Sequence, residues 1–116
     1  RHSALGYEIL STMSFFQDIA KIVRSHHERW DGQGYPDHLS CTAIPLASRM
    51  IAVADAFDAM TSFRSYRSCL SMEQARAELI RNKGTQFDPQ LVDEFLEILQ
   101  GYDEIRSQLE WTFHEL

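Results

Sequence analysis

The chain has the length of one small domain and an acidic balance. Its 116 residues include 17 acidic and 11 basic side chains, for a net charge of −6, and 44% of the residues are hydrophobic. This length allows one modest core. The acidic balance argues against duplex nucleic acid as a partner, because binding to phosphates needs a concentrated basic surface. No apolar run reaches membrane-spanning length, and no stretch reads as a signal peptide.

The cysteines indicate the redox compartment, and the first residue indicates that the chain belongs to a longer protein. Cys41 and Cys69 are too few and too far apart for a thiolate zinc site or a disulfide framework, so we expect a reducing compartment, the cytoplasm. The sequence starts at Arg1 without a methionine, in the middle of an apolar pattern. We therefore expect it to be a piece of a longer protein.

The predicted elements are helices, so the expected fold class is all-α. Apolar residues at helical spacing form two stripes before residue 26, with a break expected near Ser11–Ser14. Residues 31–44 hold two glycines, a proline and many polar side chains, which predicts a loop. Pro45 then opens a strongly apolar helix through about Met60.

Helix-capping residues mark two further helices. Ser71 and Gln74 form a capping box, and Gly84 is placed to end that helix, near residue 83, in the left-handed conformation. Asp88 and Pro89 suit the N-cap and the first position of the next helix. Both helices carry the apolar stripe of an amphipathic element, so both are expected to pack on a core.

The densest group of chemically active side chains lies at residues 26–36. His26 and His27 are followed there by an acid and a loop that contains two glycines. Neutral imidazole is the commonest protein ligand for zinc, iron, manganese and nickel. A pair of histidines also suits the exposed end of a helix, because polar side chains are mostly solvated. The pair by itself leaves both interpretations open.

Two carboxylates lie on the apolar helix that Pro45 opens. Asp55 and Asp58 are spaced i, i+3, on one face. A carboxylate buried in such a helix is unfavourable unless a cation compensates it. Arg49 on the same helix could be that cation, as a structural ion pair. A metal ion is the alternative, because an oxygen donor beside two imidazoles suits iron(II), manganese(II) and zinc.

An arginine pair follows this helix. Arg64 and Arg67 are spaced i, i+3, with Tyr66 between them. Arginine binds phosphate in a bidentate manner, and aromatic rings or guanidinium planes stack on bases. The pair also suits a solvated helix end. Metal-type donors, a loop and an arginine pair in this order would together suit a phosphodiester substrate.

Several motifs stand in the order and spacing of one known family. They are His26-His27-Glu28, Asp31-Gly32-Gln33-Gly34-Tyr35-Pro36, Ile44-Pro45, Ala54-Asp55-Ala56-Phe57-Asp58-Ala59-Met60-Thr61-Ser62, Tyr66-Arg67 and Gly84-Thr85-Gln86-Phe87-Asp88-Pro89. The chain resembles the HD-GYP domain, a branch of the HD phosphohydrolases that hydrolyses the bacterial second messenger cyclic di-GMP. The resemblance is strongest over residues 2–99. It implies that residues 1–116 are the C-terminal portion of an HD-domain-like helical bundle, with extra C-terminal helices.

The resemblance also implies site residues and cofactors. The implied metal ligands are His2, His26, His27 and Asp55, and the implied substrate contacts are Gly34, Tyr35, Arg64 and Arg67. Two or three divalent metal ions would sit in the complete domain, with iron or manganese preferred over zinc or nickel. They would lower the pKa of a bridging water and clamp the phosphate oxygens.

The chain departs from the family pattern at three places. The family's His-Asp dyad and a nearby lysine are expected upstream of Arg1, and neither His38 nor His114 is followed by an aspartate. The pair Asp37-His38 stands where the family has a glycine after Tyr-Pro. The family's Asp-Arg-Pro-Tyr is Phe63-Arg64-Ser65-Tyr66 here, which removes a charge beside the arginine pair. We therefore expect an incomplete domain that is inactive alone and holds metal weakly or as a single ion.

Two functions compete on this basis. The first is a metal-dependent cyclic di-GMP phosphodiesterase. The second is a non-catalytic adaptor that docks a partner such as a diguanylate cyclase domain or a response-regulator receiver domain. The four metal-type donors favour the enzyme, because an adaptor has no physical need of them.

Apolar surface predicts self-association. An HD-like domain covers its central helix on several sides, and some of the covering helices are expected before Arg1. Soluble monomers seldom expose more than a few hundred Å² of contiguous apolar surface. We therefore expect a homo-oligomer. The last amphipathic segment, from about Asp103 with Leu109, Trp111 and Phe113, is a candidate contact element.

Overall fold

The computed structural model describes residues 2–63 and 68–115. The elements are α1 (His2–Arg24), a 3₁₀ turn η1 (Cys41–Ala43), α2 (Leu46–Thr61), α3 (Met72–Arg81) and α4 (Pro89–Glu115). These ranges contain no strand, only an isolated bridge between Lys83 and Phe87, which confirms the all-α class. Over the same ranges, no helix combines the length and hydrophobicity of a membrane span.

A small core joins α2, α3 and the first turns of α4. Its buried members are Val53, Leu79, Phe87 and Val92. Beside them the rings of Phe57 and Phe95 meet edge to face, with centroids 5.3 Å apart. This edge-to-face geometry is one that aromatic pairs favour. The core therefore fixes α2, which carries Asp55, against the two helices that follow it.

The predicted beginnings of α3 and α4 are confirmed, while α3 ends at Arg81 with Asn82 as its C-cap, ahead of Gly84. The Ser71 hydroxyl accepts from the Gln74 N–H at 3.1 Å, and the Gln74 side chain accepts from the Ser71 N–H at 3.0 Å. Gly84 lies in the left-handed region, at φ +79°. The Asp88 carboxylate accepts from the Gln90 N–H at 3.0 Å, as an N-cap does. The cap residues predicted from the local sequence therefore do stand at the beginnings of these two helices.

Arg49 pairs with a different carboxylate from the two expected. Its Nη1 lies 2.7 Å from Asp88, and the two side chains are only 14% and 7% exposed. Its Nε donates to the Ile44 carbonyl at 2.9 Å. The expectation that Arg49 could neutralise Asp55 or Asp58 is therefore wrong. The pair instead ties the start of α2 to the start of α4, which lies close in space but far along the chain.

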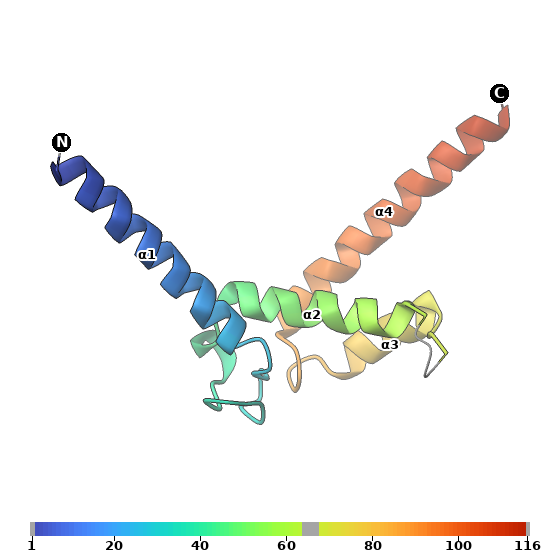
Figure 1. The fold of residues 1–116 in the computed structure, drawn as a ribbon. Coiled ribbons are helices and arrows are strands. Elements are labelled where there is room, and N and C mark those ends of the chain that lie inside the picture. The colour runs from blue at the N-terminus through green and yellow to red at the C-terminus, as the bar shows by residue number, and fades with distance from the viewer. Residues whose placement is uncertain (1, 64–67, 116) are drawn as a thin grey trace.

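The helices α1 and α4 diverge from α2 as two arms (Figure 1). The radius of gyration is 19.2 Å, whereas a compact domain of this length has about 13 Å. Large apolar side chains are exposed along both arms. They are Ile9, Met13, Phe15, Phe16, Ile19 and Val23 on α1, and Ile98, Tyr102, Ile105 and Leu109 on α4. The arms thus carry apolar faces that the described chain does not cover.

Two predicted helix boundaries are wrong, and both arms are longer than expected. The break near Ser11–Ser14 is absent, since α1 runs from His2 to Arg24 and the Thr12 hydroxyl donates to the Glu8 carbonyl at 2.8 Å within it. The segment expected from Asp103 is the continuation of α4. Gly101 lies inside the helix, since one glycine costs only about 1 kcal/mol relative to alanine and no proline follows it.

Candidate metal-binding and active site

The histidine pair lies in the turn that directly follows α1. This helix ends at Arg24, and the rings of His26 and His27 have centroids 3.8 Å apart. The buried Ser48 of α2 donates its hydroxyl to the Ile22 carbonyl at 2.9 Å. That bond attaches the end of α1 to α2. The two imidazoles are therefore held next to the helix that carries Asp55.

His26 is oriented by the backbone of the helix before it. Its Nδ1 lies 2.5 Å from the Val23 carbonyl oxygen. A carbonyl only accepts, so Nδ1 is the donor in this contact, and in the neutral tautomer that donates from Nδ1 the lone pair is on Nε2. Histidines that bind metals commonly donate their second ring N–H to a backbone carbonyl in this way. The arrangement leaves Nε2 of His26 available as a donor to a metal.

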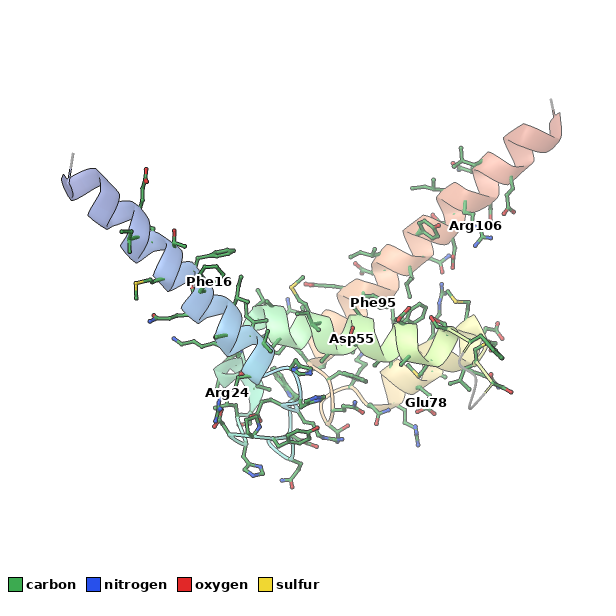
Figure 2. The ribbon with its side chains drawn as sticks, viewed as in Figure 1. Phe16, Arg24, Asp55, Glu78, Phe95 and Arg106 are labelled. Carbon is green, nitrogen blue, oxygen red and sulfur yellow. The ribbon has the colours of Figure 1, made fainter. Side chains whose placement is uncertain are left out.

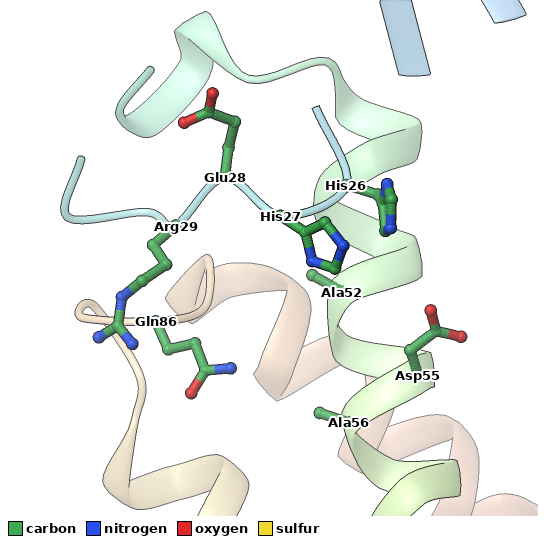
Figure 3. Close-up of a pocket in the computed structure, with 8 residues that line it drawn as sticks. All are labelled: His26, His27, Glu28, Arg29, Ala52, Asp55, Ala56 and Gln86. Atoms are coloured by element: carbon green, nitrogen blue, oxygen red, sulfur yellow. The ribbon is translucent and has the colours of Figure 1, made fainter. Parts of the chain in front are cut away.

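His26, His27 and Asp55 line one cavity of about 380 Å³ (Figure 3). The other residues of its wall are Glu28, Arg29, Ala52, Ala56 and Gln86. Ala52 and Ala56 lie one turn apart on α2, on either side of Asp55 in the sequence. Their small side chains leave space below the two imidazoles. The cavity is therefore bounded by nitrogen donors from the turn and by a carboxylate from α2.

Asp55 and Asp58 are exposed, so the expectation that their helix buries them is wrong. Of the residues in α2, only Ser48 and Val53 are buried. Asp58 accepts a hydrogen bond from the Ser62 hydroxyl at 3.0 Å. An exposed carboxylate needs no cation for its solvation, so burial gives no argument for a metal at Asp55. Its position on the cavity wall is what singles it out.

The donor types of this cavity fit a transition metal, because imidazole nitrogen and carboxylate oxygen suit zinc, iron and manganese. The spacing is wider than a metal site requires. Among the described residues, no three His, Cys, Asp or Glu side chains come close enough to hold one ion. A bound ion would therefore have to draw His26, His27 and Asp55 together.

The structure does not bring His2 to the histidine pair. His2 is the first residue of α1, and the pair follows the last residue of the same 23-residue helix. At a rise of about 1.5 Å per residue, the helix separates them by roughly 33 Å. The N-terminus accordingly stands at the far tip of its arm (Figure 1). Arg64 and Arg67 lie outside the described residues.

Gly34 and Tyr35 lie beside the cavity and do not form its wall. Gly34 is buried against the backbone of residues 27–29, where an added Cβ would stand 2.6 Å from the Arg29 nitrogen. Only glycine allows this approach. The Tyr35 ring stacks on the His27 ring, with centroids 4.9 Å apart and planes 22° apart. Gly34 and Tyr35 thus contact the backbone and the ring of His27. The resemblance had implied that these two residues contact the substrate.

The sequence motifs contained Glu28 and Gln86, but neither residue was predicted to be part of the site. Glu28 is 5% exposed, and its carboxylate accepts from the N–H groups of Asp37 and Leu39 at 2.6 and 2.9 Å. Gln86 enters the cavity wall because its carbonyl accepts from the Trp30 N–H at 3.2 Å. Both residues belong to motifs quoted above. The motifs could have flagged them, although spacing alone does not reveal these contacts.

Two ion pairs, one part-buried and one exposed, lie in or beside the loop. The guanidinium of Arg29, with a further contribution from the Gln33 N–H, holds the pKa of Asp31 below its ordinary value. Hydrogen bonds from Arg24 at 2.8 and 2.9 Å likewise hold the pKa of Asp37 below its ordinary value. Both carboxylates therefore stay ionised to lower pH than free aspartate. The second pair connects the loop to the last turn of α1.

The chain is similar in sequence to several curated phosphodiesterases. The chain is 49% identical over 112 residues to a cyclic di-GMP phosphodiesterase response regulator of Xanthomonas campestris, covering 95% of this chain and 28% of that protein. It is 41% identical to a 3'3'-cGAMP-specific phosphodiesterase of Vibrio cholerae, covering 94% and 21%. It is 40% identical to a cyclic di-GMP phosphodiesterase of Thermotoga maritima, covering 98% and 32%. The chain thus spans a third or less of the length of these curated relatives.

A solved structure and a family profile complete the comparison. The fold matches a crystal structure of a cyclic GMP-AMP specific phosphodiesterase of V. cholerae with a TM-score of 0.62 and 33% identity. The match covers 71% of this chain and 18% of that one. Residues 1–91 match the HD domain family. The names of these relatives agree with the resemblance to the HD-GYP branch. The chain therefore belongs to the HD domain family, whose phosphohydrolases depend on metal ions.

Proposed function

We propose that this domain is part of a metal-dependent phosphodiesterase that hydrolyses a cyclic dinucleotide, with cyclic di-GMP as its substrate. One observation carries the proposal. Two imidazoles from the turn after α1 and a carboxylate from α2 line the same cavity. The relatives named as cyclic di-GMP and 3'3'-cGAMP phosphodiesterases support the substrate class. The exposed free thiols of Cys41 and Cys69 support a cytoplasmic location.

The proposed ligands are His26, His27 and Asp55, and the proposed metal is iron or manganese in preference to zinc or nickel. Mixed imidazole and carboxylate donors suit these ions. The complete domain would hold two or three of them, because a phosphodiester is cleaved well between paired metals. His2 enters the proposed set through the resemblance alone. Its participation would require α1 to depart from the continuous helix of residues 2–24.

Different residues of the chain would bind the metal ions, leave space for the substrate and hold its phosphate or guanine. When bound, the metal ions supply a hydroxide nucleophile near neutral pH and offset the charge of the phosphate. His26 is preset for binding by its bond to Val23. Ala52 and Ala56 leave the room that a phosphodiester needs below the imidazoles. Arg64 and Arg67 are proposed to hold phosphate or guanine from the segment that follows α2.

The test uses the protein at its full natural length, loaded with Mn²⁺ or Fe²⁺. Cyclic di-GMP and 3'3'-cGAMP are supplied separately, and formation of the linear dinucleotide is followed. Asp55→Asn should abolish metal loading and turnover together, because it removes a charged ligand. Asp58→Asn is the matched control, since Asp58 lies one turn further along α2 and outside the cavity wall. Retention of metal and rate by Asp55→Asn would contradict the assignment.

The arginine pair has a separate kinetic signature. Arg64→Ala or Arg67→Ala should chiefly raise KM and leave kcat nearly unchanged, as the loss of uniform substrate binding does. A fall in kcat with an unchanged KM would instead place the arginines in the chemical step. Steady-state kinetics on both substrates separates these outcomes. If 3'3'-cGAMP has the higher kcat/KM, the substrate is corrected while the reaction class stands.

The exposed arms favour a second candidate, a non-catalytic adaptor. The apolar faces of α1 and α4 are suited to docking a protein partner. A diguanylate cyclase domain or a receiver domain is the proposed partner in that case. The same full-length preparation decides between the two. An adaptor would bind a purified diguanylate cyclase domain, take up no metal and leave both cyclic dinucleotides intact.

A further inference from the structure

We propose that Glu28 and Tyr35 are positioning residues for His27. The buried carboxylate of Glu28 holds the loop, and the loop in turn holds the Tyr35 ring against the imidazole. This inference rests on the proposed role of His27 as a metal ligand. It gives Tyr35, in the loop of residues 31–36, a function that differs from the substrate contact implied by the resemblance.

The two neighbouring histidines are held by different means. The ring of His26 donates to the Val23 carbonyl. The ring of His27 makes no hydrogen bond to another described residue, and its ring contacts are the rings of His26 and Tyr35. An imidazole without a hydrogen bond is free to rotate unless something packs on its face. The Tyr35 ring, stacked at 4.9 Å, supplies that packing.

Glu28 anchors the loop that carries Tyr35. Its carboxylate accepts from two backbone N–H groups, those of Asp37 and Leu39, at 2.6 and 2.9 Å. Hydrogen bonds to a charged acceptor are shorter and stronger than those between neutral groups. Figure 3 shows the Glu28 carboxylate pointing away from Asp55, while His27 extends toward α2. The carboxylate is therefore committed to the loop and faces away from the proposed ligand on α2.

The loop also touches the chain beside His27 at two further points. The Tyr35 N–H donates to the His27 carbonyl at 3.3 Å. Gly34 lies against the backbone of His27 and Arg29, with no room for a Cβ. These contacts fix the Tyr35 backbone relative to the His27 backbone. With both backbones fixed, the stacked Tyr35 ring restricts the rotation of the His27 ring.

A ligand fixed before the metal arrives binds it more tightly, because less side-chain freedom is lost on binding. Loss of the groups that orient a metal-binding histidine typically lowers metal affinity by about 10–100-fold. Tyr35→Ala should produce a loss in this range. Tyr35→Phe keeps the ring and should restore wild-type affinity, because the stack does not need the phenol hydroxyl.

The experiment measures Mn²⁺ affinity by titration calorimetry on the full-length protein, together with two readouts on the metal-free protein. The first is the nuclear Overhauser contact between the rings of Tyr35 and His27. The second is amide hydrogen exchange at Leu39. Glu28→Gln should accelerate exchange at Leu39 and weaken the ring contact, because a neutral amide replaces one acceptor oxygen with a donor.

Asp37→Asn is the matched control. Its side chain forms only the exposed pair with Arg24, at 62% and 39% exposure, while its backbone N–H still reaches Glu28. Exposed pairs of this kind contribute little, so ring contact, exchange and Mn²⁺ affinity should match the wild type. Equal Mn²⁺ affinity in wild type and Tyr35→Ala would overturn the positioning role. A wild type with the ring contact but no Mn²⁺ binding would instead overturn the proposed function and, with it, the metal half of this inference.

Discussion

The hub and the arms of this molecule use the same kind of sequence with opposite results. The hub is α2, α3 and residues 85–97, and the arms are residues 8–23 of α1 and 98–110 of α4. Apolar residues recur at helical spacing in both. In the hub, Leu79 and Val92 are fully buried, whereas on the arms Phe16 is 63% and Ile98 is 69% exposed. Figure 2 shows Phe16 clear of other helices and Phe95 where α4 meets α2. An apolar stripe therefore specifies a face of a helix and leaves open what covers it.

The largest expected effect is on the mass in solution. If the arms pair with those of a second copy, the 116-residue chain should sediment at micromolar concentration with twice its 13.4 kDa. Phe16→Glu should return it to the monomer, because a charge in an apolar contact is strongly unfavourable. Gln17→Glu, the next residue on the same exposed helix, adds the same charge and should leave the dimer intact. A monodisperse monomer with little dye-accessible apolar surface would contradict self-association.

The next largest effect is a difference between the hub and the arms in how much a substitution lowers the free energy of unfolding. Leu79→Ala should lower the free energy of unfolding by about 2–5 kcal/mol, since it opens a cavity in the core. Met13→Ala on the α1 arm should change it by no more than about 0.5 kcal/mol in the monomer, as exposed substitutions do. Urea unfolding at low protein concentration measures both. A large loss at Met13 would show that the arm is covered in solution.

A smaller effect tests whether the hub depends on local signals. Ser71→Ala removes the acceptor for the Gln74 N–H at the start of α3 and should lower stability by about 1 kcal/mol. Ser68→Ala, at an exposed serine outside any helix, is the control and should be neutral. Thermal unfolding followed by circular dichroism compares the two. Equal effects would mean that packing on the core, and not the cap, fixes the beginning of α3.

The smallest expected effect is a pH dependence at the loop. Hydrogen bonds from Arg24 depress the pKa of Asp37 in the folded chain. A depressed pKa adds stability above the unfolded value, and that contribution is lost as pH falls through the folded value. Stability should therefore drop slightly in acid, below the ordinary pKa of 3.8. Asp37→Asn should remove this part of the acid dependence, as unfolding curves across that range would reveal.

The sequence predicted the hub well because its signals are local. The capping box at Ser71, the left-handed Gly84 and the N-cap Asp88 each act within a few residues, and all are confirmed. The continuity of α1 through Ser11–Ser14 was missed, because serine and threonine are weak helix breakers whose hydroxyls can bond within the helix. The continuity of α4 past Gly101 was missed for a similar reason, since one glycine does not end a long helix.

The sequence predicted three residues that line one cavity, and it predicted their geometry less well. His26, His27 and Asp55 do line one cavity. The reason given for Asp55 was wrong, because burial of α2 depends on helices far along the chain and not on its own composition. The partner of Arg49 was missed for a similar reason. Asp88 is far along the chain, and only the tertiary fold brings it next to Arg49. The contacts of Gly34 and Tyr35 likewise depend on a loop path that motifs do not specify.

The attachment of α1 to α2 makes the first arm a lever. The bond between Ser48 and the Ile22 carbonyl acts as a fulcrum near one end of a helix that extends for roughly 30 Å on the other side. Because a hydrogen-bonded helix is stiff, a displacement of the N-terminal end of α1 would move the turn that follows the helix by a smaller distance. That turn carries His26 and His27. A molecule that binds the N-terminal end of α1 would therefore change the distance between the two imidazoles and Asp55 without contacting the cavity.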